Sequence, residues 1–486
     1  MPRTALAGSD SSINTSVNRI EDVTVSATRT ARRTDDVPAS VTVIGAQTIE
    51  QEGARDIKDL FRNELDVSVR AAPTRYGMGG NSGARAGNQG VNIRGLGGNQ
   101  VLMLVDGIRI PNGFNFGAFA TGRGDFVDVD GIKSVEVLRG PASTQYGSDG
   151  LAGAVSFRTL DPSDVLHGQS LGAFARASYA SIDQSGAGTL TVAGERDAWQ
   201  GMVLASYRLG HETATHGSDA SQNILRTQAN PADYRNRYLL GKTVYSVSAS
   251  QQLMLTLESQ NRTQATEVFS ARGLQPSSPR ATLDFDTRDQ ILRDRISLEH
   301  RFNDVNARWI QSAETRVYWQ DGRVNQFTEE SRVRAPLRTR DNDYRTRLIG
   351  LATQFETNLS GLINQKLTYG FDWSQAKVTG VRDGISPPFG EVFPVKPFPD
   401  SRYDLSGIFA QSEMELGTLS VIPGLRFDRY RISPSSHAYA GAAPQSSQGQ
   451  AITPRLGAVW RLASGFSPYG QLARGFRAPS PEQVNN

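Results

Sequence analysis

The clearest pattern in the chain is an alternation of apolar and polar residues that begins near residue 160. In the segment 366–375, Leu367, Tyr369, Phe371 and Trp373 share one face, and polar or small residues occupy the other. Successive side chains of a β-strand point to opposite faces, so this pattern predicts strands about ten residues long. The same alternation marks 253–258, 295–302 and 456–462.

The alternation predicts about 13 strands in this part of the chain. A strand of about ten residues, when tilted, is long enough to cross a bilayer. We place the strands at 171–180, 184–194, 199–210, 237–248, 251–261, 291–302, 307–320, 343–356, 365–377, 403–414, 418–430, 453–462 and 466–475.

The links between these strands alternate in length. Short links are predicted at 195–199, 248–250, 303–307, 358–361, 415–417 and 463–465. Long links are predicted at 211–236, 262–290, 321–342, 378–402 and 431–452. Short turns on one side and long loops on the other are typical of an outer-membrane β-barrel, whereas a soluble β-sandwich has no reason to sort its links in this way. The sequence therefore predicts a large antiparallel membrane β-barrel over 161–486.

The strand count also predicts that the barrel is incomplete. Closed bacterial barrels have even strand numbers and leave no free edge. We therefore expect Asn486 not to be the natural end of the barrel.

The first 160 residues differ in texture from the rest. Residues 1–20 are polar and are predicted to be disordered. Residues 28–160 predict a compact α/β domain, with a strand in 37–49 and a helix in 54–65. Glycine-rich strands follow in 91–110 and 135–158, and include the buried apolar run 101–105. The predicted helix would place Ile57, Leu60, Phe61 and Leu65 on one face.

Composition limits the possible classes of protein. The 486 residues contain 52 Lys and Arg against 49 Asp and Glu, so the charge balance gives no argument for nucleic-acid binding. Cysteine is absent, which excludes disulfides and thiolate metal sites. The mean hydropathy is −0.41, and no apolar run reaches the length of a membrane helix. A polar average suits a β-barrel as well as a soluble protein, because only alternate residues of a barrel strand face lipid.

Three motifs in the N-terminal domain carry a family resemblance. They are Ile93-Arg94-Gly95, Leu104-Val105-Asp106-Gly107 and the stretch from Val135 to Pro141. Such a domain followed by a large barrel resembles the TonB-dependent outer-membrane transporters, whose N-terminal domain is a plug inside the barrel. The resemblance implies about 22 strands in the complete protein. The resemblance implies that Arg94 and Arg139 are plug arginines that pair with barrel glutamates. By alternation Glu258 and Glu299 face inward and are candidate partners.

The resemblance also assigns the segment before the plug. Glu21, Asp22, Val23, Thr24, Val25, Ser26 and Ala27 look like the TonB box, the peptide that pairs with the periplasmic protein TonB by strand addition. Without the resemblance, the sequence favours an ordinary first strand for this segment over a peptide that pairs with another protein. MPRTALAGSD at the start lacks the apolar core of a signal peptide, so the protein is cytosolic, or its leader has been removed or lies upstream.

The C-terminal motif suggests a substrate. Phe476-Arg477-Ala478-Pro479 is similar to the FRAP box of the haem and haemoglobin receptors in this family. In that branch a histidine that ligates haem iron follows the box, and this chain stops at Asn486 before reaching one. Residues 1–166 contain no histidine either, so Tyr76 or Met78 of the plug are possible substitutes.

Five histidines remain to be considered as haem contacts. Loop histidines are candidates because neutral imidazole is a common ligand of haem iron, although a solvated loop residue is the more frequent case for each. His300 falls on the lipid-facing stripe and His167 at the junction of plug and barrel, so both are expected to be structural. The candidates in the predicted long loops are His211, His216 and His437.

We therefore expect a TonB-dependent transporter and receptor of the Gram-negative outer membrane that takes up haem, from free haem or from haemoglobin. The expected partners are TonB with its inner-membrane energising complex, haem or haemoglobin, and outer-membrane lipid. Haem would be the transported ligand, with no prosthetic group and no certain metal site. No pairing of nucleophile and base, phosphate loop or HExxH motif points to an enzyme.

Three alternatives stay open at this stage. The first is a ferric-siderophore receptor of the same family, because FRAP-like strings also occur there. The second is a soluble β-rich binding or adhesion protein. The third is a surface-signalling role beside transport, which would need a small extra domain before the TonB box; residues 1–20 are too short to supply one.

Overall fold

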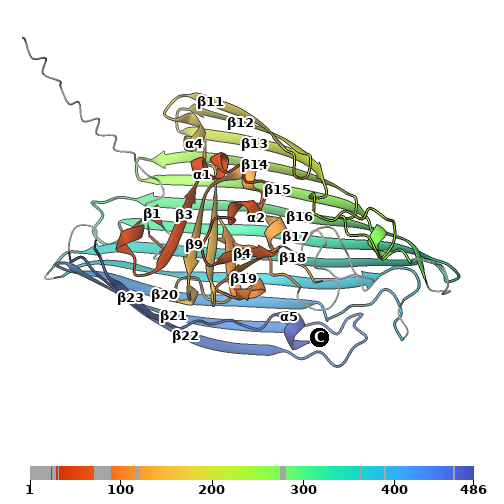
Figure 1. Cartoon of the computed structure of the whole chain (residues 1–486). Coiled ribbons are helices and arrows are strands. Elements are labelled where there is room, and N and C mark those ends of the chain that lie inside the picture. The colour runs from red at the N-terminus through yellow and green to blue at the C-terminus, as the bar shows by residue number, and fades with distance from the viewer. Residues whose placement is uncertain are drawn as a thin grey trace, which may run out of the picture.

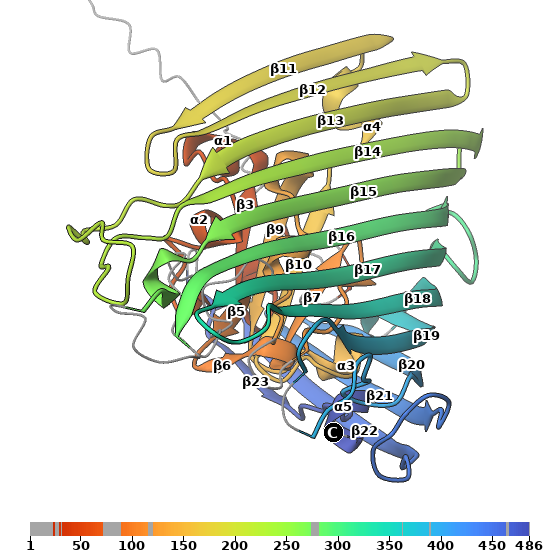
Figure 2. The same ribbon diagram turned by 90° about the vertical axis from the view of Figure 1, so that its right-hand side faces the viewer.

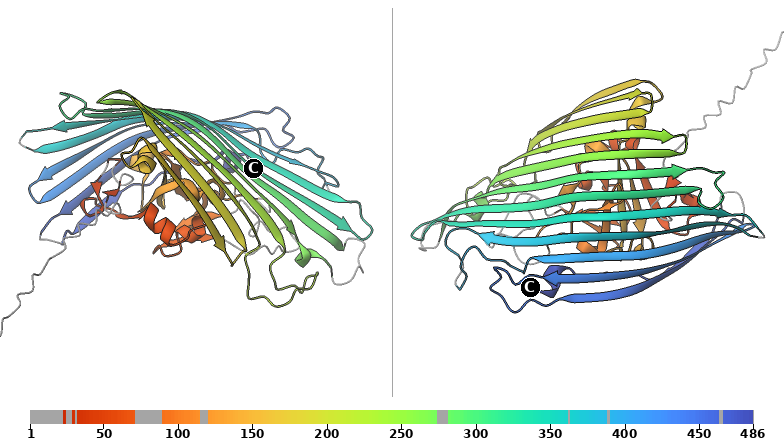
Figure 3. Two further views of the ribbon diagram at one scale, coloured as in Figure 1. Left: turned by 90° about the horizontal axis from the view of Figure 1, so that it is seen from above. Right: turned by 180° about the vertical axis from the view of Figure 1, so that it is seen from behind.

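The computed structural model describes residues 23–24, 29–30, 32–70, 89–114, 120–273, 281–361, 363–387, 390–462 and 466–485. It has two parts. A curved antiparallel sheet of thirteen strands, in sequence order from β11 to β23, wraps around a smaller α/β domain, the plug (Figure 1). Seen from above, the sheet forms an arc and the plug lies against its concave face (Figure 3).

The plug is built around a mixed five-stranded sheet. Its strands lie in the order β3-β9-β10-β7-β8; β7 and β10 run parallel, and the other pairs run antiparallel. Three smaller strands form the sheet β4-β5-β6, and a two-stranded ribbon joins β1 to β2. The strand bounds are β1 Val23–Thr24, β2 Arg32–Arg33, β3 Ser40–Gly45, β4 Val67–Arg70, β5 Gly90–Ile93, β6 Leu96–Gly97, β7 Val101–Val105, β8 Ile108–Arg109, β9 Ile132–Arg139 and β10 Gly153–Thr159.

Short helices connect these strands and close the ends of the plug. The α-helices are α1 Ala46–Gln51, α2 Ile57–Leu60, α3 Ser143–Tyr146 and α4 Pro162–Leu166, and α5 Pro481–Val484 lies at the other end of the chain. The 3₁₀ helices are η2 Thr34–Asp36, η4 Gly98–Gln100, η6 Gly124–Phe126, η7 Val129–Gly131 and η8 Phe269–Ala271. None of the helices in the described ranges has the length and apolar character that a membrane crossing requires.

The core of the plug confirms the apolar run 101–105 as a buried strand. All five residues of β7 are buried, because Val101, Met103 and Val105 pack into one apolar cluster and Leu102 and Leu104 pack into another. The predicted helix 54–65 is shorter than expected: only Ile57–Leu60 is helical. Ile57, Leu60 and Phe61 are buried as predicted, but Leu65 is 83% exposed because the chain has already turned toward β4.

The predicted barrel strands are all present, and most are longer than expected. Their bounds are β11 Leu171–Ala180, β12 Ser185–Arg196, β13 Trp199–His211, β14 Ala232–Ser248, β15 Gln251–Glu267, β16 Thr282–Asn303, β17 Ser312–Arg332, β18 Arg338–Leu359, β19 Asn364–Asp383, β20 Ser401–Leu416, β21 Leu419–Pro434, β22 Ser447–Trp460 and β23 Tyr469–Ala473. Neighbours in sequence pair antiparallel throughout (Figure 2).

The alternation sorts side chains between the two faces of this sheet. Thr256, Glu258, Arg295 and Glu299 face the plug and are buried. Apolar residues between them point away from the plug and stay exposed, as a lipid-facing stripe requires. Examples from neighbouring strands are Leu255, Leu257, Ile296, Leu298, Val317, Trp319 and Ile349, all between 37% and 48% exposed.

One of the predicted long links is replaced largely by strand. Residues 321–342 were expected to form a loop, but β17 continues to Arg332 and β18 starts at Arg338, which leaves only 333–337 between them. The added strand ends, 321–332 and 338–342, carry polar residues at most positions of both faces, as suits strand ends that face water rather than lipid. The apolar–polar alternation from which the strands were predicted therefore ends before the strand does.

Candidate functional site: the contact surface between plug and barrel

The first described residues of the predicted TonB box are paired with the plug. Val23 and Thr24 form β1, which pairs with β2. Thr24 is fully buried, and its hydroxyl donates to Glu136 Oε2 of β9 at 2.7 Å. The other members of the box, Glu21, Asp22 and Val25 to Ala27, lie outside the described residues.

Arg29, two residues after the predicted TonB box, contacts the barrel wall. Its Nη2 lies 3.0 Å from Asp372 Oδ2 of β19. Its guanidinium stacks over the ring of Phe409 at 4.1 Å and over that of plug Tyr146 at 4.9 Å. The Arg29 carbonyl accepts a hydrogen bond from Gln354 at 2.9 Å. One arginine next to the box therefore contacts three barrel strands and the plug.

A second wall carboxylate holds the same segment. Thr30 donates to Glu413 Oε1 at 3.3 Å, and Arg32 Nη2 lies 2.5 Å from Glu413 Oε2. Glu413 lies on β20 near the short-turn side of the sheet, and its side chain is buried. Moving the segment away from the plug would break both contacts and expose a buried carboxylate.

The two plug arginines bind carboxylates of the plug itself. Arg94 Nε lies 3.1 Å from Asp66 Oδ2, and both side chains are about half exposed. Arg139 is buried, and its Nη2 lies 2.8 Å from Glu64 Oε2 and donates to the Leu65 carbonyl at 2.9 Å. The prediction that Arg94 and Arg139 pair with barrel glutamates is therefore wrong among the described residues.

The reason is that the candidate glutamates already have partners in the wall. Glu258 Oε1 lies 2.5 Å from Arg293 Nη2, and its Oε2 lies 2.7 Å from Arg295 Nε. Glu299 binds Arg316 and Arg301 of the neighbouring wall positions. Both glutamates face inward as alternation predicted, but their negative charge is compensated before the plug is reached.

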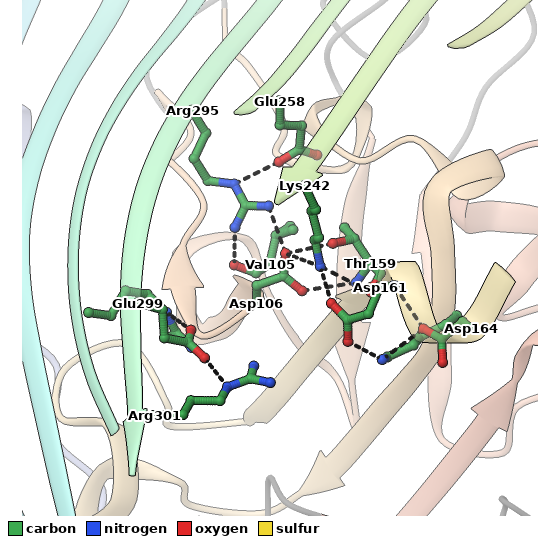
Figure 4. Close-up of polar contacts among 12 residues, drawn as sticks. Val105, Asp106, Thr159, Asp161, Asp164, Lys242, Glu258, Arg295, Glu299 and Arg301 are labelled. Atoms are coloured by element: carbon green, nitrogen blue, oxygen red, sulfur yellow. Dashed lines mark hydrogen bonds and ion pairs between the residues drawn. The ribbon is translucent and has the colours of Figure 1, made fainter. Parts of the chain in front are cut away.

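Ion pairs between plug and barrel occur in both polarities: plug Arg55 lies 3.0 Å from barrel Asp183, and other pairs have the cation on the wall. Arg295 of β16 donates from Nη2 to Asp106 Oδ2 of the plug at 2.7 Å and from Nη1 to the Val105 carbonyl at 3.1 Å (Figure 4). Asp106 belongs to the Asp106-Gly107 turn after β7, and has a left-handed backbone with φ 47°. This turn, part of the Leu104-Val105-Asp106-Gly107 motif, thus presents a carboxylate to a barrel arginine. The cation comes from the wall and the anion from the plug.

Lys242 of β14 adds a second wall cation to this cluster. Its Nζ lies 2.7 Å from Asp161 Oδ1 and 3.9 Å from Asp106 Oδ2 (Figure 4). Asp161 also pairs with Lys133 at 2.5 Å. Burial alone raises the pKa of Asp106 and of Asp161, but Lys242 outweighs it, with Arg295 at Asp106 and Lys133 at Asp161, and lowers both pKa values. Both carboxylates are therefore anionic at neutral pH.

A separate carboxylate pair fixes the plug to β13. Asp130 of η7 lies 3.1 Å from Arg208 Nη2 and accepts from Ser206 at 2.7 Å. Asp128, two residues earlier, accepts a hydrogen bond from Asn236 of β14. Burial, and then the negative charge of Asp130, raise the pKa of Asp128 to about 7. The charge of Asp128 in this contact therefore changes near neutral pH.

At the opposite end of the plug, the FRAP-like loop packs on α3 and the turn that follows it. The Phe476 amide donates to Ser143 Oγ at 2.9 Å, and the Ala478 amide donates to Ser148 Oγ at 3.0 Å. Ala478 is 2% exposed, and Arg477 Nε lies 3.7 Å from plug Asp149. The loop is thus seated on the plug rather than extended into solvent.

An aromatic cluster lies beside this loop. Phe114 of the plug, Tyr344 of β18 and Phe398 of the 384–400 link have ring centroids 5.6 to 6.2 Å apart. Phe476 of the FRAP-like loop packs against Tyr430 at 6.4 Å. The plug, two barrel strands, the 384–400 link and the FRAP-like loop therefore supply aromatic rings at the same end of the molecule.

The candidate histidines are spread over this end. His437 is exposed in the 435–446 link, whose Tyr439 hydroxyl donates to the Asn485 carbonyl next to α5 at 3.3 Å. His216 is exposed in the 212–231 link. His211 ends β13, and its Nδ1 lies 2.9 Å from Asp233 on the outer face of the sheet. Tyr76 and Met78 lie outside the described residues.

Among the candidates that the structure describes, His437 belongs to a link that contacts the end of the FRAP-like segment. Within the described ranges, no group of three or more histidine, aspartate or glutamate side chains is placed to hold a metal ion.

Sequence comparison decides the family. Residues 33–154 match the TonB-dependent Receptor Plug Domain, and residues 213–486, more than half of the chain, match the TonB dependent receptor-like beta-barrel. The chain belongs to the TonB-dependent receptors. The predicted family and fold, a plug followed by a barrel, are therefore confirmed.

The curated relatives of this TonB-dependent receptor include proteins named for haem. The chain is 27% identical over 489 residues to the hemin receptor of Yersinia enterocolitica, a match that covers 99% of this chain and 62% of the relative. It is 27% identical over 251 residues to the hemoglobin-haptoglobin-binding protein A of Haemophilus influenzae, which covers 49% of this chain and 23% of the relative. The chain spans about 62% of the length of the hemin receptor.

Solved structures share the fold of this receptor at low identity. The hemophore receptor HasR of Serratia marcescens, in complex with its hemophore HasA and heme, matches with a TM-score of 0.67, 18% identity, and coverage of 92% of this chain and 64% of that chain. The ferripyoverdine receptor of Pseudomonas aeruginosa matches with a TM-score of 0.69, 15% identity, and coverage of 94% and 60%. These likenesses bear on fold alone.

Proposed function

We propose that this TonB-dependent receptor takes up haem across the Gram-negative outer membrane, from free haem or from haemoglobin. The observation that carries the proposal is the position of the FRAP-like loop, which is docked on the plug beside a cluster of aromatic rings. Similarity over nearly the whole chain to a hemin receptor supports the same substrate.

The loop end of the molecule suits a porphyrin. A flat apolar ring system packs favourably against aromatic side chains. Phe476 and Tyr430 are only partly buried and offer such rings, whereas Phe114, Tyr344 and Phe398 are buried in the same cluster. Haem carries carboxylates, for which Arg477 is a suitable partner. Neutral imidazole ligates haem iron, and His437 is the candidate because its link contacts the segment after the FRAP-like loop.

TonB is the proposed energy-coupling partner. A peptide such as 21–27 can add as a strand to the edge of a partner sheet. In this structure Val23 and Thr24 are paired with β2 instead, and Arg29, Thr30 and Arg32 are bound to Asp372 and Glu413. Strand addition to TonB therefore competes with these contacts, and a ligand that weakens them favours TonB.

The plug contacts suggest where a path opens. Asp106 and Asp161 are held by Arg295 and Lys242, cations of the barrel wall. Force applied through the N-terminal segment must break these ion pairs before the plug is displaced from the wall between β14 and β16. The plug would then act as a gate that closes again when its carboxylates return to the wall.

A haem titration of the purified protein in detergent tests the substrate. We expect a shifted Soret band with saturable binding, and weaker binding in H437A but not in the control H211A. The competing function is ferric-siderophore uptake, which the similarity to the ferripyoverdine receptor favours at the level of fold. Saturable binding of a ferric siderophore without a Soret shift from haem would establish that alternative and contradict our proposal.

A further inference from the structure

The outer face of the sheet carries a hollow that the transport site does not use. Its volume is about 920 Å³, and it lies over the loop-side ends of six neighbouring strands, β13 to β18. Most of its lining side chains come from the face that points away from the plug. These are Tyr207, Leu209, His211, Asp233, Arg235, Thr263, Ala265, Arg288, Gln290, Asn325, Phe327 and Asp341.

The strand register shows that this lining is one continuous surface. Leu209 pairs with Arg235, Arg235 with Thr263, and Thr263 with Gln290. Arg288 pairs with Phe327 in the next pair of strands. Directly opposed residues of neighbouring strands point to the same face, so the lining side chains are mutual neighbours.

The charges in the hollow are unevenly satisfied. Asp233 pairs with His211 at 2.9 Å, and Asp341 accepts a hydrogen bond from Asn325 at 2.6 Å. In the part of the chain that the structure describes, neither Arg235 nor Arg288 lies within ion-pairing distance of a carboxylate. The hollow therefore presents two uncompensated guanidinium groups beside carboxylates that are already bonded.

The same hollow has an apolar side that continues into the lipid-facing stripe. Tyr207 and Leu209 are 41% and 45% exposed, and Phe327 lies 6.0 Å beneath the Arg288 guanidinium. Toward the short-turn side, the same face of β14 continues with Leu239, which is 50% exposed. The hollow thus lies where the apolar stripe gives way to charged residues, at the depth of lipid head groups.

We propose that this hollow binds a phosphorylated glycolipid of the outer leaflet. The planar guanidinium groups of Arg235 and Arg288 match phosphate oxygens in two-point hydrogen bonding. The polar Gln290 and Thr263 between them suit sugar hydroxyls, and the apolar stripe below suits acyl chains. A free phosphate would leave the apolar side of the hollow unused, so a lipid is the better occupant. The inference depends on placement in the outer membrane and not on the identity of the transported substrate.

Native mass spectrometry of the intact protein in detergent tests this proposal. The probe is bisphosphorylated lipid A, with dephosphorylated lipid A and inorganic phosphate as comparison ligands. The double variant R235Q/R288Q removes both charges and keeps side chains of similar length. The matched control is R196Q, an arginine that is exposed at a short turn on the opposite end of the sheet.

We expect the unaltered protein and R196Q to bind lipid A equally, and R235Q/R288Q to bind it at least tenfold more weakly. Dephosphorylated lipid A should bind as weakly to the unaltered protein as lipid A does to the double variant. Equal binding by all three proteins would overturn the proposal, as would equal binding of both lipids.

The haem titration is repeated on R235Q/R288Q to separate the two proposals. An unchanged Soret response together with lost lipid A binding supports a lipid site distinct from the substrate site. A lost Soret response with retained lipid A binding would show that the hollow holds haem instead, and would overturn the lipid assignment.

Discussion

Arg295 of the barrel wall donates to Asp106 of the plug across 2.7 Å, and both groups are withdrawn from bulk solvent. The plug of this receptor is thus held in part by wall cations on plug carboxylates, with Lys242 on Asp161 as a second instance, beside the plug cation Arg55 on barrel Asp183. In these two pairs the polarity is the reverse of the one that the family resemblance implied for Arg94 and Arg139.

R295Q should loosen the plug. The substitution removes a fully buried cation from Glu258 and Asp106, and breaking a buried pair costs about 3–5 kcal/mol. We expect faster amide hydrogen exchange in 101–109 while the barrel strands stay protected. R301Q is the control, because Arg301 is partly exposed and pairs only within the wall. Unchanged exchange in β7 would show that this ion pair does not hold the plug.

The contact made by Asp128 should weaken as the pH rises. Its pKa is raised to about 7 from a usual value of 3.8, so the folded protein binds a proton that the unfolded chain releases. The associated stability is complete below about pH 4 and is lost as the pH rises through about 7. After correction for intrinsic exchange rates, amides of 128–135 should be better protected at pH 6 than at pH 8.

D128N should remove this pH dependence, because an amide cannot ionise. D35N, at an exposed position of η2, should leave it in place. Protection that rises with pH in the unaltered protein, or a dependence that persists in D128N, would contradict the assignment to Asp128.

Arg29→Ala should release the segment next to the TonB box. It removes a charge-assisted hydrogen bond to Asp372 and stacking on Phe409, and such bonds contribute about 1.5–3 kcal/mol. A spin label at V23C reports on the segment without competing sites, since the chain has no cysteine. We expect the mobile spectral fraction to rise about tenfold, but not in R33A, whose ion pair is exposed. An immobile label in both variants would exclude a role for Arg29.

S143A/S148A should detach the FRAP-like loop from the plug. Each hydroxyl oxygen accepts a hydrogen bond from a backbone amide of the loop, and losing each bond costs about 1 kcal/mol. Haem affinity should fall several-fold, while S163A, at an exposed position of α4, should bind haem normally. Equal haem affinity in both variants would show that the docking of the loop on the plug is irrelevant to binding.

The sequence predicted the architecture because its signals are periodic. Alternation located every strand from β11 to β23, and the apolar run 101–105 located the buried strand of the plug. Strand ends in water carry no such signal, so the length of β17 and β18 was missed.

Pairing of charges was less predictable, because it depends on distances between strands far apart in sequence. Alternation correctly turned Glu258 and Arg295 inward, but it could not show that they bind each other. Asp106 was identified only as part of the 104–107 motif, with no sign of its partner. The contact of Arg29 with Asp372 spans 343 residues of sequence without a local signal. Such partners become evident only when the plug is seen inside the sheet.

The most direct measurement follows the V23C spin label while haem is added to the intact protein. If a ligand at the loop end weakens the hold on the segment after the TonB box, the mobile fraction rises with the same midpoint as the Soret shift. A full Soret shift with an unchanged spin-label spectrum would contradict the coupling between ligand binding and the TonB box.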